Sequence, residues 1–248
     1  KARRWEAAAK SATNSPPRSA EGEPVNSNAA VRTFGPGEID STYYGETNII
    51  IPAGETELSV TVGEGQLVER VAIAAGETIE RDMIVGIGHV VFNAFYVEGM
   101  RVEDSGVTFN IVGKKDIAGN RKDFGTSYGP DTAFDLPPGD YAVLASIGEA
   151  RVETPFTAEA GVASEVNSVL DAGVLAIEAP GMDFIEIFGG KKDIQGNRQG
   201  FGYGYGGALQ TTLPAGDYVV VAHTPDSSSS KEAEASVVAG ERGEIRVD

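Results

Sequence analysis

The sequence contains one segment twice, and this repeat restricts the fold more than any other feature. Residues 114–145 align with residues 191–222 at an offset of 77 without a gap, and 18 of the 32 aligned positions are identical. A weaker alignment at an offset of 85 places residues 41–88 on residues 126–173, with Tyr43 on Tyr128. Because self-similarity at a fixed period is typical of repeated structural units, we expect a module of about 80 residues in tandem.

The two fuller copies of this module are predicted over residues 88–171 and 172–248. A partial or divergent copy is predicted over residues 31–87, and it lacks the segment KKDIxGNR. Its opening strands are therefore divergent, supplied by residues 20–40, or supplied by another chain through strand addition. The sequence leaves these alternatives open.

Residues 1–30 do not follow the repeat and are predicted to be a helix fragment and a linker. The alanine-rich run over residues 2–12 favours a short helix. Residues 15–28 are rich in Pro, Ser, Asn and Glu, which is typical of a linker. Since the chain begins with Lys1 and no apolar signal region follows, we expect a piece of a longer or processed protein.

Within the repeats, apolar and polar residues alternate. Tyr141, Val143 and Ala145 fall on one side of a predicted strand, and residues 217–223 repeat the pattern. Pro-Gly and Ala-Gly pairs precede these strands and suit tight turns. Turn signals every ~8–12 residues are typical of a small antiparallel sandwich. The predicted fold class is all-β, with tandem sandwiches of the prealbumin or immunoglobulin-like kind.

Composition excludes several kinds of partner. The net charge is −17 and the isoelectric point about 4.5, so a nucleic acid is not expected to bind. The chain has no cysteine, which excludes disulfides and thiolate chemistry. No run of ~18 apolar residues is present, so we expect no membrane span.

The segments LPPGDYAVLA (Leu136–Ala145) and LPAGDYVVVA (Leu213–Ala222) resemble prealbumin-like β-sandwiches. These include the carboxypeptidase regulatory-like and collagen-adhesin B-type repeats. The longer string of GNRK, TSYG, FDLPPGDY and VLDAGVL is similar to repeats that follow the von Willebrand factor A domain in secreted alphaproteobacterial proteins. The resemblance implies non-catalytic spacer or interaction modules in an extracytoplasmic location (periplasmic, cell surface or secreted). The A domain itself is not in this chain, so its metal site is not carried over.

Candidate catalytic and metal residues are few. His89 and His223 occupy non-equivalent positions of the repeat, so the sequence predicts no enzyme and no resident cofactor. Asp116, Asn120 and Asp123 carry oxygens that suit Ca²⁺. The later copy has Gly200 in the third place, and a solvated hairpin tip is the favoured alternative.

The candidate ligand-binding residues are Phe201, Tyr203 and Tyr205, which alternate with glycines and are predicted to share one strand face. Such a row of rings would stack on a sugar or on the apolar patch of a partner. The earlier copy has Phe124, Thr126 and Tyr128 in these places. We therefore expect the two shared ring positions to be core, and Tyr203 to be the ligand candidate.

From these observations we predict a non-catalytic extracytoplasmic stalk or interaction region of a larger surface or secreted protein. The expected partner is a protein or a second copy of the chain, with assembly by strand addition as one route. Two alternatives remain: a carbohydrate-binding module that uses the aromatic strand face, and an accessory domain of an enzyme encoded upstream of Lys1. The sequence does not identify the ligand or the oligomeric state.

Overall fold

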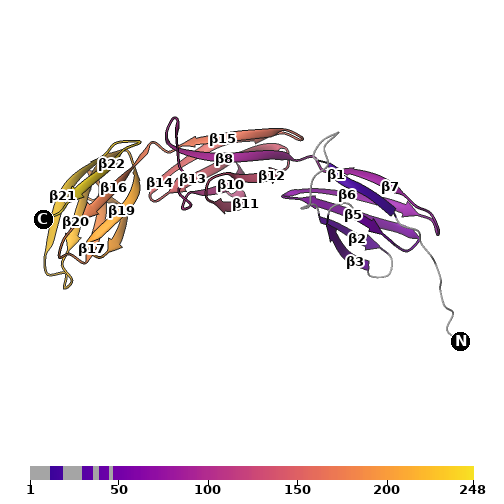
Figure 1. The fold of residues 1–248 in the computed structure, drawn as a ribbon, viewed down its shortest axis with the longest axis horizontal. Helices are drawn as coiled ribbons and strands as arrows, with labels where there is room; N and C mark the ends of the chain where they lie inside the picture. Colours follow the sequence, from indigo (N-terminus) through magenta and orange to yellow (C-terminus); the bar gives the residue numbers. More distant parts are fainter. Residues whose placement is uncertain (1–11, 19–29, 36–38, 45–46) are drawn as a thin grey trace. The chain divides into compact units, whose positions relative to one another are not determined.

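The computed structural model describes residues 12–18, 30–35, 39–44 and 47–248. In these residues the chain is entirely β, with 22 strands and no helix, which confirms the predicted fold class (Figure 1). It follows that the described part holds no helix long and apolar enough to cross a membrane. The helix predicted over residues 2–12 lies outside the described residues, except for Ala12, which begins β1 (Ala12–Arg18).

The chain divides into two compact units. The first consists of the residues up to Val91 together with residues 133–140 and 157–164. The second consists of residues 92–132, 141–156 and 165–248. β8 (Gly88–Val97) runs from the first unit into the second. This division does not test the module boundaries at residues 30, 87 and 171, which stay predictions.

The first unit contains a four-stranded and a three-stranded sheet. The larger sheet has the order β3 (Ile39–Tyr44), β2 (Ala30–Gly35), β5 (Gly54–Val62), β6 (Gly65–Ile73), with antiparallel neighbours. In the smaller sheet β1 lies between β4 (Thr47–Ile49), to which it is antiparallel, and β7 (Glu80–Ile84), to which it is parallel. The core is formed by buried aliphatic side chains: Val31, Ile49, Ile51, Leu58, Val60, Val62, Val71, Ile73, Met83, Val85 and Ile87.

β1 changes the interpretation of the N-terminal stretch. Residues 15–18, predicted to begin a linker, are the second half of this strand, while residues 19–28 of that linker lie outside the described residues. β1 and β2 both pair within the chain. The first copy therefore has its opening strands in this chain, and a strand from another chain is not needed to supply them.

The C-terminal part of the second unit has the same strand arrangement. The larger sheet has the order β18 (Arg198–Tyr205), β17 (Phe184–Lys192), β20 (Gly216–His223), β21 (Ser230–Val237). In the smaller sheet β16 (Ala172–Glu178) is antiparallel to β19 (Ala208–Pro214) and parallel to β22 (Arg242–Arg246). Between the sheets lie Leu175, Ile177, Ala179, Met182, Ile185, Ile187, Leu213, Tyr218, Val220, Ala222, Ala235, Val237 and Val247.

The intervening strands form two more sheets. One has the order β11 (Arg121–Tyr128), β10 (Thr108–Lys115), β13 (Gly139–Ile147), β14 (Ala150–Ala158). The other has the order β12 (Thr132–Leu136), β8, β15 (Ala163–Val169), and β9 (Met100–Arg101) pairs with β8. β11 and β18 begin 77 residues apart, as do β13 and β20, which is the offset of the sequence alignment.

We call strands β16–β22 the C-terminal arrangement and strands β8–β15 the middle arrangement. Two insertions distinguish the C-terminal arrangement from the middle one. β17 has nine residues and β10 has eight, and the extra residue lies where Gly189-Gly190 replaces the single Gly113. The hairpin from β20 to β21 has a loop over residues 224–229, whereas β13 and β14 are joined by residues 148–149. The second insertion therefore lies in a hairpin loop, where insertions cost little.

The weaker alignment is displaced by one residue at its tyrosine. Tyr44 pairs with Ala30 at the end of its hairpin, as Tyr128 pairs with Thr108, and both tyrosines are 70% exposed. Tyr43 instead packs against the core of the first unit. Tyr44, and not Tyr43, is thus the counterpart of Tyr128. Because side chains alternate along a strand, this shift by one residue exchanges the buried and the exposed ring.

Candidate functional site

A β-bulge in β18 separates the rings that were predicted to share a face. The pairing of β18 with β17 changes register between Glu186 and Phe188. Phe201 and Gly202 lie in this irregular stretch, and Gly202 has φ of +102°, a conformation that favours glycine. The extra residue of a bulge reverses the alternation of side chains beyond it. The prediction of a single row of three rings is therefore wrong.

Phe201 lies on the core side of the bulge. It packs against the core, and its ring meets Tyr218 edge-on, with centroids 5.1 Å apart at 90°. Phe124 and Tyr141 make the same contact in the middle sheet at 4.9 Å and 84°, and Gly125 there also has a positive φ of 119°. The expected packing against the core is confirmed for Phe201, while its role as a ligand contact stays a prediction.

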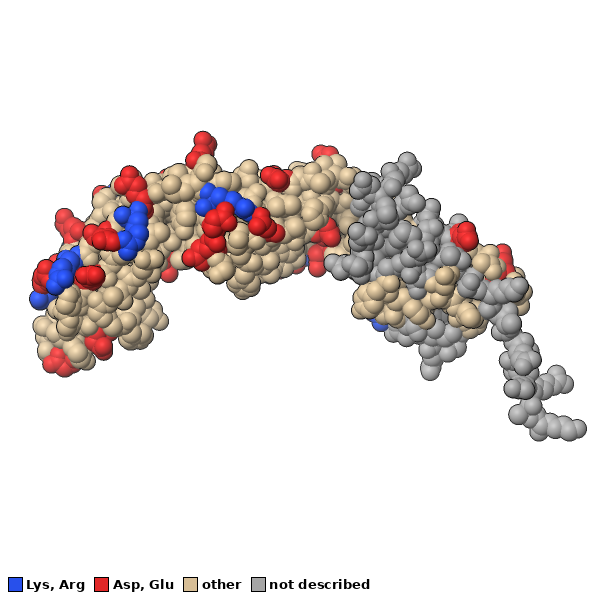
Figure 2. All heavy atoms as spheres, in the orientation of Figure 1, with Lys and Arg blue, Asp and Glu red and all other residues tan. Residues whose placement is uncertain are grey.

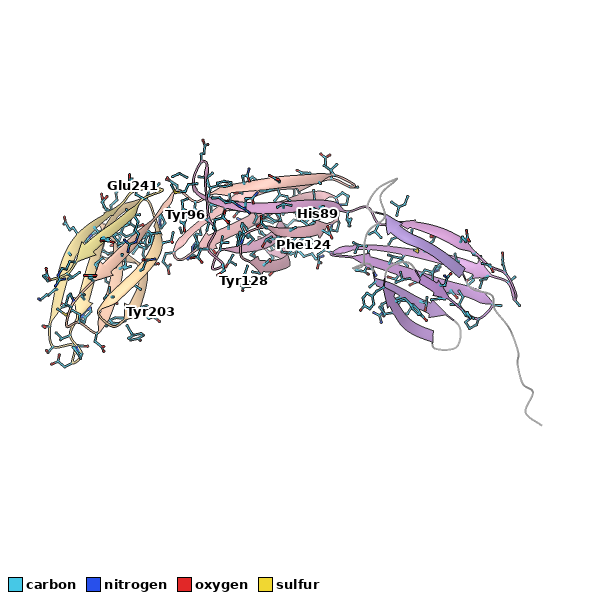
Figure 3. The ribbon with its side chains drawn as sticks, in the orientation of Figure 1. His89, Tyr96, Phe124, Tyr128, Tyr203 and Glu241 are labelled. Carbon is cyan, nitrogen blue, oxygen red and sulfur yellow. The ribbon has the colours of Figure 1, made fainter. Side chains whose placement is uncertain are left out.

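Tyr203 and Tyr205 lie on the solvent side of the sheet, with exposed fractions of 64% and 78%. Their rings are 5.9 Å apart, and both contact Phe184, at 5.6 and 5.2 Å. The prediction that Tyr205 is core is wrong, as it is for Tyr128, which is 70% exposed in the middle sheet. Figure 3 labels Tyr203 and Tyr128, each at the surface of its sheet.

A carboxylate and an imidazole adjoin these rings. Glu186 lies opposite Tyr203 in the sheet, and its Oε2 is 3.0 Å from Nε2 of His223. The imidazole ring of His223 lies 5.9 Å from the ring of Phe184. Both side chains are partly exposed, at 34% and 26%. We call these five residues, Phe184, Glu186, Tyr203, Tyr205 and His223, the aromatic face.

Three of these residues were not candidates from the sequence: Phe184, Glu186 and His223. In β17, Phe184 and Glu186 alternate with the buried Ile185 and Ile187. That alternation would have placed both on the solvent side of a strand. The pairing of His223 with Glu186 depends on the register of β17 against β20, for which the sequence gives no signal.

The middle sheet has different side chains at the same register positions. Thr108 pairs with Tyr128 and Ser146, and Asn110 pairs with Thr126. The amide Nδ2 of Asn110 donates a hydrogen bond to Thr126 Oγ1 at 2.9 Å. Of the three rings of the aromatic face, only the tyrosine shared by positions 128 and 205 recurs there. The middle sheet thus offers a natural comparison in which the ring cluster is absent.

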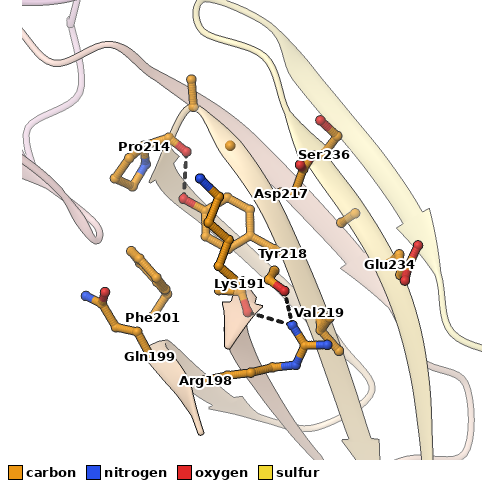
Figure 4. A pocket seen from close by; sticks show the side chains of 15 residues that line it. Lys191, Arg198, Gln199, Phe201, Pro214, Asp217, Tyr218, Val219, Glu234 and Ser236 are labelled. Atoms are coloured by element: carbon orange, nitrogen blue, oxygen red, sulfur yellow. Dashed lines mark hydrogen bonds between the residues drawn. The ribbon is translucent and has the colours of Figure 1, made fainter. Parts of the chain in front are cut away.

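A cleft of about 740 Å³ lies beside Tyr218 in the same C-terminal arrangement (Figure 4). Its lining includes the Phe201 ring and Ala235, which pairs with Tyr218. In the middle arrangement Phe156 stacks on Tyr141, with centroids 5.5 Å apart. Alanine in place of this ring leaves space beside Tyr218, which accounts for part of the cleft.

Two polar side chains that line the cleft, Arg198 and Tyr218, make hydrogen bonds within the protein. Arg198 Nη1 donates hydrogen bonds to the carbonyl oxygens of Gly189, at 3.1 Å, and of Gly190. Tyr218 donates its phenolic hydrogen to the Pro214 carbonyl at 2.7 Å, and burial raises the pKa of this phenol.

Of the three calcium candidates, Asp116 and Asn120 lie together in one turn, and Asp123 belongs to another. Oδ1 of Asp116 accepts a hydrogen bond from the backbone N–H of Asn120 at 2.8 Å. Oδ1 of Asp123 accepts hydrogen bonds from Asn110 Nδ2 and from the backbone N–H of Gly125, at 3.1 and 2.8 Å. The two carboxylates thus serve two different turns. The described residues contain no group of three or more His, Asp or Glu side chains arranged for a metal ion.

Each histidine has one carboxylate partner. His89 Nδ1 is 2.8 Å from Oδ1 of Asp135, and His223 is paired with Glu186. The His89–Asp135 pair belongs to the first unit, and the imidazole of His89 is exposed. Sequence neighbours gave no indication of either acid, because each partner lies on another strand or turn.

In the loop over residues 224–229, the carboxylate of Asp226 is hydrogen-bonded to groups of the same loop. Asp226 Oδ1 accepts hydrogen bonds from Thr224 Oγ1 at 2.7 Å, from Ser228 Oγ at 2.8 Å and from Ser228 N–H at 3.1 Å. The Thr224 and Ser228 hydroxyls and that N–H lower the pKa of Asp226 to about 2. The loop is thereby a hydrogen-bonded turn, with Ser227 at φ of +54°.

Comparison with known proteins gives only distant structural similarity. No protein-family model matches the chain, and no curated protein matches it either. Among solved structures, the Bacillus anthracis TIE protein is 15% identical, over 96% of this chain and 50% of that one, with a TM-score of 0.29. The GBS52 minor pilin of Streptococcus agalactiae is 10% identical over 64% and 94%, with a TM-score of 0.33. The pilus adhesin SpaC of Lactobacillus rhamnosus GG is 7% identical over 96% and 43%, with a TM-score of 0.29.

The chain spans about half the length of the TIE protein and of SpaC. TM-scores of this size carry no argument about function. The class that the strands themselves define is an all-β chain of small sandwiches with repeated strand order.

Proposed function

We propose that this chain is a non-catalytic interaction region, or stalk, of a larger extracytoplasmic protein. The observation that carries the proposal is the strand arrangement, in which a four-stranded and a three-stranded sheet recur along the chain. In the C-terminal arrangement these sheets enclose their own core, from Leu175 to Val247. Repeated small cores of this kind extend a protein and present loops and sheet faces to partners.

Surface exposure of the whole protein tests the proposal. Intact cells of the source organism would be treated with protease, and the chain detected with an antibody against residues 88–248. We expect cleavage without lysis, or recovery of the chain in the medium, while a cytoplasmic control protein stays intact. A chain that stays protected after the outer envelope alone is opened, and is cleaved only when the cytoplasmic control protein is cleaved, would overturn the proposal.

The aromatic face favours a second candidate function, the binding of a neutral carbohydrate. The apolar face of a sugar ring stacks on flat aromatic side chains, and its hydroxyls need hydrogen-bond partners at the edge of the stack. Tyr203, Tyr205 and Phe184 supply the rings, and Glu186 and His223 supply the polar edge. A charge of −17 disfavours acidic sugars, so we propose a neutral glycan as the ligand.

Glycan binding is tested with the whole chain on an array of neutral and acidic oligosaccharides, followed by calorimetry on any neutral glycan that binds. Tyr203→Ala should weaken binding by about tenfold or more, because an aromatic contact contributes ~0.5–1.5 kcal/mol in addition to the apolar area that the ring buries. Tyr128→Ala is the matched control, since this exposed tyrosine lies outside the aromatic face. Binding that Tyr203→Ala leaves unchanged, or an array without any bound neutral glycan, would remove this candidate.

A further inference from the structure

The two hairpin tips each carry an isoleucine that is fully exposed to solvent. The segments KKDIAGNR at residues 114–121 and KKDIQGNR at residues 191–198 differ at one position, where Ala118 corresponds to Gln195. Ile117 and Ile194 are exposed to the full extent that an isoleucine can be, with relative values of 109% and 103%. We call residues 114–122 and 191–198 the basic tips.

Hydrogen bonds give both tips the same shape. In the first tip the N–H of Asp116 donates to the Asn120 carbonyl, and the N–H of Asn120 donates to the Asp116 carboxylate, both at 2.8 Å. Asp193 and Asn197 make the same two bonds at 2.8 Å in the second tip. The glycine before each asparagine has a positive φ, of 85° and 88°. The turn therefore accounts for the shared Asp, Gly and Asn.

The turn does not account for the isoleucine. β-Branched residues are poor choices in tight turns, where Gly, Asn, Asp and Ser are favoured. The isoleucine contacts no core in either tip, and the next position along the chain differs between the copies, as Ala118 and Gln195. An apolar side chain that is held outward by a fixed turn is what a small binding anchor requires.

The charge of the tips is opposite to that of the chain. Seven of the 20 Lys and Arg residues lie in the two tips, but only two of the 37 Asp and Glu residues do. The tips thus carry +5, and the remainder of the chain carries −22. Figure 2 shows acidic side chains spread over the described part of the face in view. A basic tip is consequently complementary in charge to the acidic side chains on the remainder of this same protein.

We propose that the basic tips dock on the acidic surface of a second copy of this chain, with Ile117 and Ile194 as the apolar anchors. This inference rests on the proposed interaction function and names the partner and the contact surface. The partner is assigned as a second copy because the remainder of the chain, with a charge of −22, offers the basic tips an acidic protein surface.

Sedimentation velocity of the whole chain over a range of concentrations tests the inference, at low and at physiological salt. We expect association that rises with concentration and weakens with salt. Ile117→Ser combined with Ile194→Ser should weaken the association by about tenfold or more, as the loss of a buried isoleucine predicts. Lys115→Glu with Lys192→Glu should abolish it. The control is Val68→Ser, which removes a 48% exposed apolar side chain outside the tips.

The tip positions are exposed, so the variants should keep the far-ultraviolet circular dichroism of the parent chain. A chain that stays monomeric up to ~1 mM would overturn the inference. Association that the isoleucine and lysine variants leave unchanged would overturn it as well. So would a monomer whose tips bind vesicles of anionic phospholipid. None of these outcomes depends on the protease test of surface exposure, so the two proposals fail separately.

Discussion

Filling the cleft beside Tyr218 should stabilise the C-terminal arrangement. In the middle arrangement Phe124 contacts Tyr141 at 4.9 Å, and Phe156 contacts both Tyr141, at 5.5 Å, and Phe92, at 5.1 Å. The C-terminal arrangement has the counterpart of the Phe124–Tyr141 contact but an alanine in place of Phe156. Ala235→Phe restores that ring in a cleft of about 740 Å³, so the larger side chain has room.

The expected gain follows from the half-buried state of Phe156. Half of the burial of a phenylalanine side chain is about 1 kcal/mol, and an added aromatic contact contributes ~0.5–1.5 kcal/mol. The side-chain entropy lost on ordering the ring is about 0.5 kcal/mol. The free energy of unfolding should therefore rise by about 1–2 kcal/mol.

Urea unfolding of the whole chain, followed by circular dichroism, measures this change as a higher midpoint at constant slope. Hydrogen–deuterium exchange of peptides from β20 and β21 assigns it to the expected strands. The reciprocal variant Phe156→Ala should lower stability by about 2–3 kcal/mol in the middle arrangement. If Ala235→Phe lowered the stability or exposed β20 and β21 to faster exchange, the assignment of the cleft to the missing ring would be refuted.

Three further predictions concern the bulge, the hairpin loop and the core. Gly202→Ala should destabilise the chain by about 1–3 kcal/mol, because φ of +102° strains any L-residue, while Gly200→Ala, with open space at its Cβ, should change the urea midpoint little. The carboxyl of Asp226 should titrate with a midpoint of about 2 in carbon-detected NMR. Because the pKa of Asp226 is lowered, the contribution of its hydrogen bonds to stability is complete above the ordinary value of 3.8 and is lost as the pH falls through about 2. A titration midpoint near 3.8 would contradict the hydrogen bonds from Thr224 and Ser228 to this carboxylate. Leu213→Ala, at a side chain with 0% exposure, should cost about 2–5 kcal/mol in urea unfolding, whereas Val221→Ala on the solvent side of β20 should cost under ~1 kcal/mol.

The turns and the alternating strands of the repeats were predictable because they follow from local chemistry. Pro-Gly and Ala-Gly pairs define turn positions, and the alternation around Tyr141 and Tyr218 defines buried faces. The rule that alternate residues of a strand share a face fails at a bulge, however, because the extra residue reverses the alternation. The sequence carries no signal that marks the position of this bulge. That is why Phe201 and Tyr205 were assigned to the same side of β18.

β1 was missed for a related reason. Its sequence, ATNSPPR, contains two prolines, which are rare in paired strands because proline has no N–H to donate. The structure accommodates them where the register of β1 against β7 shifts, between Ser15 and Arg18. An irregularity of this kind depends on both strands, so the sequence of one strand does not reveal it. The candidate site depended on cross-strand pairing in the same way, through His223 and Glu186.

The parallel pairing of first and last strands has a mechanical consequence. β16 and β22 run in the same direction side by side, as β1 and β7 do. The chain therefore enters at one end of the smaller sheet and leaves at the other. Tension along the chain would slide these two strands past each other, so that all the hydrogen bonds between Val174–Glu178 and Arg242–Arg246 share the load at once. Strands pulled in this shearing direction resist force far better than strands that are peeled apart one bond at a time.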